Sequence, residues 1–384
     1  MSKVKLGDVA IEHKETCGGS KDGYPIVGLE HLTPEEVTLT AWDEDSDNTF
    51  TKVFRKGNVL FGRRRAYLRK AAVAPFDGIC SGDITVIEAI PDRILPELLP
   101  FIIQNDGLFS FAVGKSAGSL SPRVKWEHLK NYEFELPSMD RQRELAELLW
   151  AMDTTKKSYQ KLIAATDELV KSQFIEMFGR TETVTSNLSA WPSYEIRELY
   201  DVKSSKRIYA KELTTSGIPF LKVGDVLERI NTGESHPTVF ISEQKYCELK
   251  ESGLVPKAGD ILVTSRGTIG KCYILADDDA FYFQDGMISW LKAKCDCRLL
   301  PEFTAALFAE EGFLKALDEV TNKTTVTYIS LDKLAGLKVI CPPEEKQREY
   351  LDFLRQSDKS KFELEQALAE LNATYKRIIA ENLG

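Results

Sequence analysis

The sequence lacks any long hydrophobic run. No stretch approaches the roughly 18 consecutive apolar residues that indicate a membrane-spanning helix, so no contact with a membrane is expected. The first fifteen residues turn polar and acidic, which is unlike a secretory signal peptide. Cysteine is sparse, and an odd set of seven scattered residues favours a reducing compartment over a disulfide framework. We therefore expect a cytoplasmic protein.

Sequence motifs of catalytic, phosphate-binding and metal-binding sites are also missing. Residues 114–116 (GKS) resemble the end of a phosphate-binding loop, but Phe109 stands where that loop needs its first glycine. Cys295-x-Cys297 has no second pair and no histidine at metal-ligand spacing. Residues 341–344 (CPPE) lack the polar first residue and the closing aromatic ring of an amino-methyltransferase loop. We expect no catalytic residue, no metal site and no cofactor.

The composition is that of a globular protein. Of 384 residues, 43% are hydrophobic and 28% are charged, and the length predicts two to three domains. The 50 basic and 59 acidic residues give a net charge of −9, which argues against a chain that coats DNA indiscriminately. A negative net charge does not prevent basic residues from clustering in one part of the chain.

The chain contains an internal repeat. Residues 124–144 align with 329–349 without a gap, at an offset of 205. Upstream, residues 56–68 align with 258–270, at an offset of about 202, so the order of elements is kept with a few loop residues gained. The chain is therefore two copies of one unit of about 190 residues.

Each copy divides into a globular part and a long helix. Short β-type runs alternate with Gly and Pro in the first part, whereas the second part begins after a proline and contains no internal Gly or Pro. We place the globular parts at 1–139 and 181–344 and the helices at 140–180 and 345–384. The predicted fold class is α+β, with two repeated α/β domains separated by two long antiparallel coiled-coil helices in a pseudo-two-fold arrangement.

A heptad seam supports the pairing of the two helices. Apolar residues recur at alternating spacings of four and three, as in the a and d positions of a coiled coil. A lysine interrupts each seam at the matching place, where a polar residue can fix the register. The alternative is that each helix packs only on its own globular part. The seam residues are Leu145, Leu149, Met152, Lys156, Tyr159 and Ile163 in the first helix and Leu354, Lys361, Leu364, Leu368, Leu371 and Tyr375 in the second.

Basic residues gather in the first copy at residues 55–70, which contain seven basic residues and no acidic one. An arginine fork can grip two phosphate oxygens or the O6 and N7 atoms of guanine. A solvated turn is the less specific interpretation; we predict contact with nucleic acid. The candidate residues are Arg63, Arg64, Arg65, Tyr67, Arg69 and Lys70.

The second copy has a weaker counterpart. Ser265, Arg266 and Lys271 occupy the place of the arginine cluster, and Lys206 and Arg207 lie in a second basic segment. Polar loops at 114–125 and 321–330 also suit phosphate and sugar contacts. Recognition of two different half-sites requires two related basic modules with different side chains.

These segments together resemble the specificity (S) subunit of type I restriction-modification systems. The resemblance covers nearly the whole chain, and its most specific part is the doubled pattern of strand, proline, acidic-x-Gln-Arg-Glu and long helix. The segments that carry it are residues 54–89, 95–104, 116–126, 132–153, 256–274 and 337–354.

The resemblance implies a non-catalytic subunit with two target-recognition domains that read the two halves of a bipartite site in double-stranded DNA. It also implies that the helices form a spacer and dock two methyltransferase (M) subunits and, through them, the restriction (R) subunits. Other interpretations remain open from the residues alone. One is a coiled-coil scaffold that binds only protein, and the other is a self-contained restriction enzyme.

Overall fold

The computed structural model describes residues 2–19, 21, 23–44, 48–180, 191–322 and 326–383. The chain forms two compact units, which are considered separately. Unit 1 comprises residues 1–163 with 362–384, and unit 2 comprises residues 164–361. No described helix is long and apolar enough to span a membrane.

Unit 1 begins with short strands and helices that precede the first long helix. Its elements are β1 (Ser2–Lys5), α1 (Leu6–Val9), β2 (Ala10–Glu12), β3 (Ile26–Val27), η1 (Leu29–His31), β4 (Lys52–Phe54), β5 (Val59–Gly62), η2 (Ala66–Leu68), β6 (Ala71–Val73), β7 (Gly78–Cys80), β8 (Ile84–Ala89), α2 (Leu99–Ile103), α3 (Asp106–Gly114), α4 (Trp126–Leu129), β9 (Glu133–Leu136) and the start of α5 (Met139–Phe178).

The main sheet of unit 1 is antiparallel, with the strand order β2-β8-β5-β6. Its central strand β8 reads ITVIEA, a β-branched run whose first four side chains are buried. Helices α2 and α3 cover one face of the sheet, where Phe101 and Phe109 share a core with Val59 and Phe61. A second sheet has the order β3-β7-β4, and β1 pairs with β9.

Unit 2 repeats this plan and adds two helices, α8 and α9. Its elements are β10 (Ser193–Glu195), α7 (Ile196–Leu199), β11 (Tyr200–Lys203), η3 (Ala210–Glu212), β12 (Leu213–Thr214), β13 (Ile218–Leu221), α8 (Val223–Thr232), β14 (Phe240–Ile241), α9 (Glu243–Glu251), β15 (Ile261–Thr264), β16 (Cys272–Ile274), β17 (Tyr282–Phe283), β18 (Ile288–Ala293), α10 (Pro301–Ala309), α11 (Glu311–Val320), α12 (Leu331–Ala335), β19 (Lys338–Ile340) and the start of α13 (Glu344–Leu383).

The two main sheets have the same topology. In unit 2 the strand order is β11-β18-β15-β16, and each strand takes the place of β2, β8, β5 or β6 in chain order. The outer pair recurs as well, since β10 pairs with β19 as β1 pairs with β9. The structural repeat therefore follows the sequence repeat and confirms the predicted α+β class.

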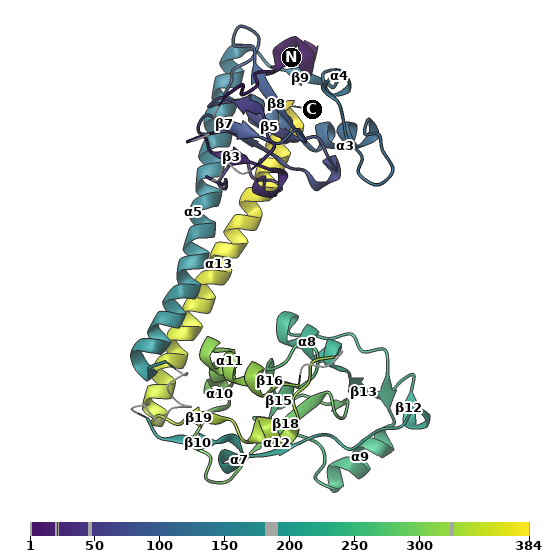
Figure 1. Ribbon diagram of the computed structural model, residues 1–384. Helices are drawn as coiled ribbons and strands as arrows, with labels where there is room; N and C mark the ends of the chain where they lie inside the picture. Colours follow the sequence, from purple (N-terminus) through teal and green to yellow (C-terminus); the bar gives the residue numbers. More distant parts are fainter. Residues whose placement is uncertain are drawn as a thin grey trace. The chain divides into compact units, whose positions relative to one another are not determined.

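The long helices lie side by side in both units (Figure 1). In unit 1, Leu145 and Leu149 near the start of α5 share a core with Ile379 and Leu383 at the end of α13. In unit 2, the end of α5 packs against the start of α13, and the ring centroids of Phe174 and Tyr350 lie 5.4 Å apart. The two helices therefore run antiparallel in each unit.

Every residue of the predicted seam is buried or half-buried. The two lysines that interrupt the seam have different partners, however. Lys361 on α13 forms an ion pair with Asp167 on α5, with 2.7 Å between the charged atoms. Lys156 instead lies 3.4 Å from the carboxylate of Glu36 in the globular part. The matching positions therefore make a helix–helix contact in unit 2 and a helix–domain contact in unit 1.

The boundaries of the long helices differ slightly from the expected ones. Helix α5 ends at Phe178 rather than at residue 180, because Gly179 adopts a φ of 80°. Its amide donates to the carbonyl of Ile175, a helix C-cap that favours glycine. Helix α13 spans Glu344–Leu383. The expected start of the second globular part, residue 181, lies outside the described residues.

A buried glutamine fastens each long helix to its globular part. Gln142 is 1% exposed; its amide donates to the carbonyl of Pro137 at 3.0 Å and its oxygen accepts from the amide of Leu95 at 2.8 Å. Gln347 makes the matching bonds 205 residues later, to Pro342 at 2.8 Å and Leu300 at 2.9 Å. The recurring glutamine of the sequence repeat is therefore a structural clamp.

We predict that replacing either clamp residue destabilises its own unit. Gln142→Met leaves the Leu95 amide and the Pro137 carbonyl buried without partners, at a cost of about 2–4 kcal/mol. Gln347→Met also removes a bond to the carbonyl of Arg298, at 2.9 Å, and is expected to cost at least as much in unit 2. Urea unfolding measures the loss, and hydrogen exchange at residues 95–104 or 300–309 shows which unit opens.

The neighbouring arginines provide matched controls. Arg143 and Arg348 have side chains that are 57% and 63% exposed, so their replacement by Met is expected to change stability by less than about 0.5 kcal/mol. Equal losses for the glutamine and arginine variants would contradict the clamp.

Candidate nucleic-acid interface

The arginine cluster of unit 1 forms the connection between β5 and β6. The two strands pair closely at Gly62, whose amide donates to the carbonyl of Lys70 at 2.8 Å. A Cβ atom at Gly62 would lie 3.0 Å from that carbonyl oxygen, so a larger residue would push the strands apart. Ala66, in the middle of the loop, is buried in the core. The loop is therefore anchored at both ends and at its centre.

Two arginines in left-handed conformation bracket the turn η2. Arg65 and Arg69 have φ values of 53° and 54°, which are uncommon for residues other than glycine. This backbone path leaves the side chain of Arg65 exposed and that of Tyr67 55% exposed. Arg65 and Tyr67 are the members of the cluster that are presented to solvent.

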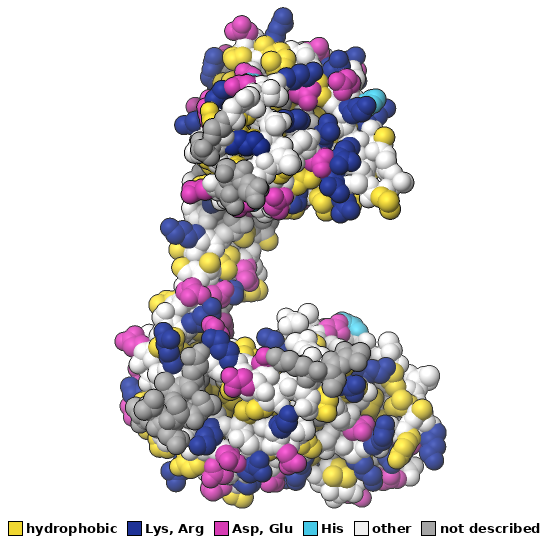
Figure 2. All heavy atoms as spheres, viewed as in Figure 1, with side chains coloured by type: hydrophobic (Ala, Val, Ile, Leu, Met, Phe, Trp, Pro, Cys, Tyr) yellow, Lys and Arg dark blue, Asp and Glu magenta, His cyan; other side chains and the backbone are white. Residues whose placement is uncertain are grey.

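Backbone hydrogen bonds tie this loop to two other segments. The amide of Arg63 donates to Asp83, the amide of Arg65 donates to Pro122, and the carbonyl of Arg63 accepts from Val124, at 2.8–3.0 Å. The β5–β6 loop, the turn before β8 and the segment after α3 therefore form one surface. Figure 2 shows dark blue Lys and Arg side chains gathered on this part of unit 1, beside α3 and the loop that follows it.

Unit 2 has the same three links at the matching place, which fixes the equivalent residues. Ser265 takes the position of Arg63, and Gly267, with a φ of 75°, takes the left-handed position of Arg65. The matching bonds, at 2.9–3.0 Å, run from the amide of Ser265 to Met287, from the amide of Gly267 to Thr327, and from the amide of Ile329 to Ser265.

Arg64 is held by neighbours in unit 1. Its guanidinium donates to the hydroxyl of Ser121 and lies 3.4 Å from Asp83. Arg123 donates to the same carboxylate, with atoms 2.7 and 3.3 Å apart. These guanidinium groups, Arg123 first, hold the pKa of Asp83 below its usual range. The carboxylate of Asp83 is therefore already neutralised by two arginines.

Arg69 and Lys70 make contacts inside unit 1. Arg69 pairs with Asp106 and Glu35, and its guanidinium lies over the ring of Phe109 at 5.3 Å. The ammonium of Lys70 donates to the carbonyl of Leu29 at 2.7 Å. These contacts stabilise the loop, and contact of either side chain with nucleic acid stays a prediction.

Arg63 and Lys52, a residue that the sequence did not predict, are two basic residues of this part of unit 1. The Nε atom of Arg63 is buried and has no hydrogen-bond partner among the described residues. Lys52, on β4, is near it: burial, followed by the charge of Arg63, lowers the pKa of Lys52. The ammonium of Lys52 donates to the carbonyl of Ile84 at 2.6 Å. Nothing in the local sequence marks Lys52, because only the sheet brings it to this position.

The structure also corrects the interpretation of Ser265. This residue is 4% exposed, and its hydroxyl lies 2.6 Å from that of Ser289. A hydroxyl that is buried and bonded in this way is not presented to a ligand. Its place in the repeat matches that of Arg63, but its role is internal.

The other predicted residues of unit 2 are exposed. Arg266, Lys271 and Lys206 are exposed, and Arg207 is 70% exposed with a distant carboxylate partner, Asp285, at 3.8 Å. The turn at 285–288 joins the two basic segments. In this turn, the carbonyl of Met287 accepts a hydrogen bond from the amide of Ser265, and the amide of Gly286 donates one to the hydroxyl of Ser204. The structure therefore brings the two segments of unit 2 together.

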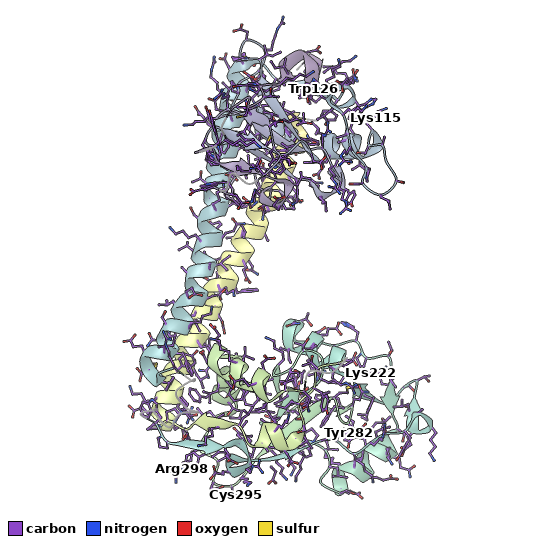
Figure 3. The ribbon with its side chains drawn as sticks, in the orientation of Figure 1. Lys115, Trp126, Lys222, Tyr282, Cys295 and Arg298 are labelled. Carbon is purple, nitrogen blue, oxygen red and sulfur yellow. The ribbon has the colours of Figure 1, made fainter. Side chains whose placement is uncertain are left out.

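The remaining motifs occupy other places. In Figure 3, Lys115 lies where α3 ends, Tyr282 lies among the strands of unit 2, and Cys295 lies near the lower edge of that unit. The thiol of Cys297 lies 3.8 Å from the carbonyl of Leu299. Among the described residues, no group of three or more His, Cys, Asp and Glu could hold a metal ion.

Comparison with known proteins identifies relatives over most of the chain. The family model described as "Type I restriction modification DNA specificity domain" matches residues 1–165 and 189–373. A Haemophilus influenzae protein assigned as a type I restriction enzyme specificity subunit is 29% identical over 42% of this chain and 38% of its own length. The specificity subunit of the type I restriction enzyme MjaVIII, from Methanocaldococcus jannaschii, is 26% identical over 65% of this chain and 60% of its own length.

The chain thus spans less than two thirds of the length of these two curated relatives. A solved structure, described as showing complex assembly and conformational transition of the type I R-M system, contains a chain with the same fold. The match covers 99% of this chain and 97% of that chain, with a TM-score of 0.62 and 19% sequence identity.

We predict that Arg69 and Arg65 differ sharply in their effect on stability. Arg69→Met removes the partner of two carboxylates and the contact with Phe109, and is expected to cost about 1–3 kcal/mol. Arg65→Met removes an exposed side chain and is expected to leave stability unchanged within about 0.5 kcal/mol. Thermal unfolding of both variants measures the difference. A larger loss for Arg65→Met would contradict the assigned roles.

Proposed function

The chain belongs to the family of type I restriction modification DNA specificity domains, and we propose that it is the DNA-specificity subunit of such a system. In this proposal it binds double-stranded DNA in the cytoplasm and recognises a bipartite site. It carries no active site of its own and directs methylation and cleavage by partner subunits. The described residues offer no observation that favours the other two interpretations, a protein-only scaffold and a self-contained enzyme.

One observation carries the proposal. The same loop, held by the same three backbone links, presents exposed basic side chains in both units. In unit 1 the exposed residues are Arg65 and Tyr67, next to Arg63; in unit 2 they are Arg266 and Lys271, next to Lys206 and Arg207. Exposed arginines and lysines on a rigid loop suit contacts with phosphates and base edges.

The difference between the two loops supports recognition of two different half-sites. The left-handed position holds Arg65 in unit 1 and Gly267 in unit 2, so an arginine fork is available at this point in one unit only. A loop that kept its frame but changed its side chains would read different bases from the same position. We propose residues 1–139 and 181–344 as the two target-recognition domains.

We propose that α5 and α13 form the spacer between these domains and dock the partners. Each helix is 40 residues long and contributes to both units. The family resemblance supports two methyltransferase (M) subunits as direct partners, with restriction (R) subunits bound through them.

A binding selection tests the proposal. The chain, assembled with its methyltransferase subunits, is incubated with random duplex DNA, and the bound fraction is sequenced. We expect two short defined sequences separated by an undefined spacer of fixed length. Arg65→Ala is expected to relax positions in one half only and Arg266→Ala in the other, by about 1–3 kcal/mol for each base that the side chain reads.

Arg143→Ala and Arg348→Ala serve as controls, because they remove one exposed positive charge from each unit on a long helix. They are expected to leave the selected motif intact. Selection of no motif, or of one continuous motif that both loop variants relax alike, would contradict the proposal.

A further inference from the structure

An apolar side chain stands at the tip of the loop that follows α3. Leu120 is 90% exposed, the largest exposed fraction among the large hydrophobic side chains of the described residues. Single exposed apolar side chains are common on protein surfaces, so the exposure of Leu120 gains meaning only from the surface around it. Nothing within the described part of unit 1 covers Leu120.

The loop that carries Leu120 is held firmly at its base. Ala117 and Arg123 exchange two backbone hydrogen bonds, at 3.0 and 2.9 Å. Gly118 adopts a φ of 117°, which reverses the chain where other residues would be strained. The hydroxyl of Ser121, next to Leu120, accepts from the guanidinium of Arg64. Leu120 is therefore presented by a braced turn that is attached to the arginine loop.

The surroundings of Leu120 are cationic. Residues 114–125 contain Lys115, Arg123 and Lys125 and no acidic residue. The nearby carboxylate of Asp83 is already paired with Arg123 and Arg64. An apolar tip within a basic rim is typical of surfaces that grip phosphates on both sides of an inserted side chain. A purely apolar protein partner would provide no counter-charge for the exposed Lys115 and Lys125.

We propose that Leu120 is a wedge that inserts between neighbouring base pairs of the DNA bound by unit 1. The inference rests on the proposed DNA-binding function and deepens it. The side chain would unstack one base step, while the exposed Lys115 and Lys125 hold the flanking phosphates. The unstacked step would be chosen by its deformability, so Leu120 would add specificity at a position where no hydrogen bond reads a base.

The wedge belongs to one half-site. At the offset of 205 that relates the ends of the two copies, the residue that corresponds to Leu120 is Thr325. Thr325 lies outside the described residues, but its small polar side chain lacks the apolar bulk of a wedge. The next residue of that loop, Val326, is 41% exposed, less than half as exposed as Leu120. The larger distortion is therefore expected in the half of the DNA that unit 1 reads.

Fluorescence of 2-aminopurine tests this inference, because the base brightens when it is unstacked. The full chain, assembled with its methyltransferase subunits, is bound to its selected motif with 2-aminopurine placed in turn at each position. We expect one step in one half-site to brighten. With Leu120→Ser the signal is expected to disappear and binding to weaken about tenfold. Leu120→Met, which keeps the apolar bulk, is expected to retain both.

Ile11→Ser is the matched control, since Ile11 is a 48% exposed side chain on β2 of the same unit. It is expected to change neither signal nor affinity. Unchanged affinity and fluorescence with Leu120→Ser would overturn the wedge and leave the specificity function standing. Loss of methyltransferase assembly with Leu120→Ser, at unchanged DNA affinity, would overturn it in favour of a protein contact. Failure of the wild-type assembly to bind any DNA would contradict the specificity function itself.

Discussion

The arrangement of this protein depends on two buried glutamine side chains, one at the start of each long helix. Gln142 and Gln347 each accept a hydrogen bond from a globular segment and donate one to the proline carbonyl that precedes the helix. An amide is the side chain that both donates and accepts in this way, whereas an ionised carboxylate only accepts and an apolar group does neither. The helix therefore leaves its globular part in a fixed direction. The same pair of hydrogen bonds therefore joins each globular part to the long helix that follows it.

The two copies share this backbone arrangement but differ in side chains, both in the basic loops and at the ends of the long helices. The loop after β5 and its counterpart after β15 keep the same backbone links but exchange Arg65 for Gly267. The helix ends have diverged as well. Ile379 and Leu383 fill the core of unit 1, whereas their counterparts 205 residues earlier, Phe174 and Phe178, fill the core of unit 2. Aromatic and aliphatic side chains differ in volume, so each helix end fits the unit that holds it better than it would fit the other.

Much of this could be read from the sequence, because periodic patterns and repeats report on backbone structure. The repeated proline, glutamine and heptad spacings predicted the order of elements and the long helices. Side-chain roles were harder to predict. The sequence does not show that Arg69 pairs with Asp106 and Glu35 or that Ser265 bonds to Ser289, because these partners come from other segments of the chain. No pattern in the local sequence predicts the surroundings of Lys52 or the exposure of Leu120, because the folded sheet and loop alone determine their neighbours.

The most direct test of the central claim, that the two copies select DNA for partner enzymes, is a genome-wide map of methylated bases in the native host with and without this gene. We predict that one split motif, with two short defined halves around a fixed spacer, loses its methylation when the gene is deleted and regains it on complementation. A map in which every split motif stays methylated after deletion, or in which no motif depends on the gene although the partner subunits are expressed, would contradict it.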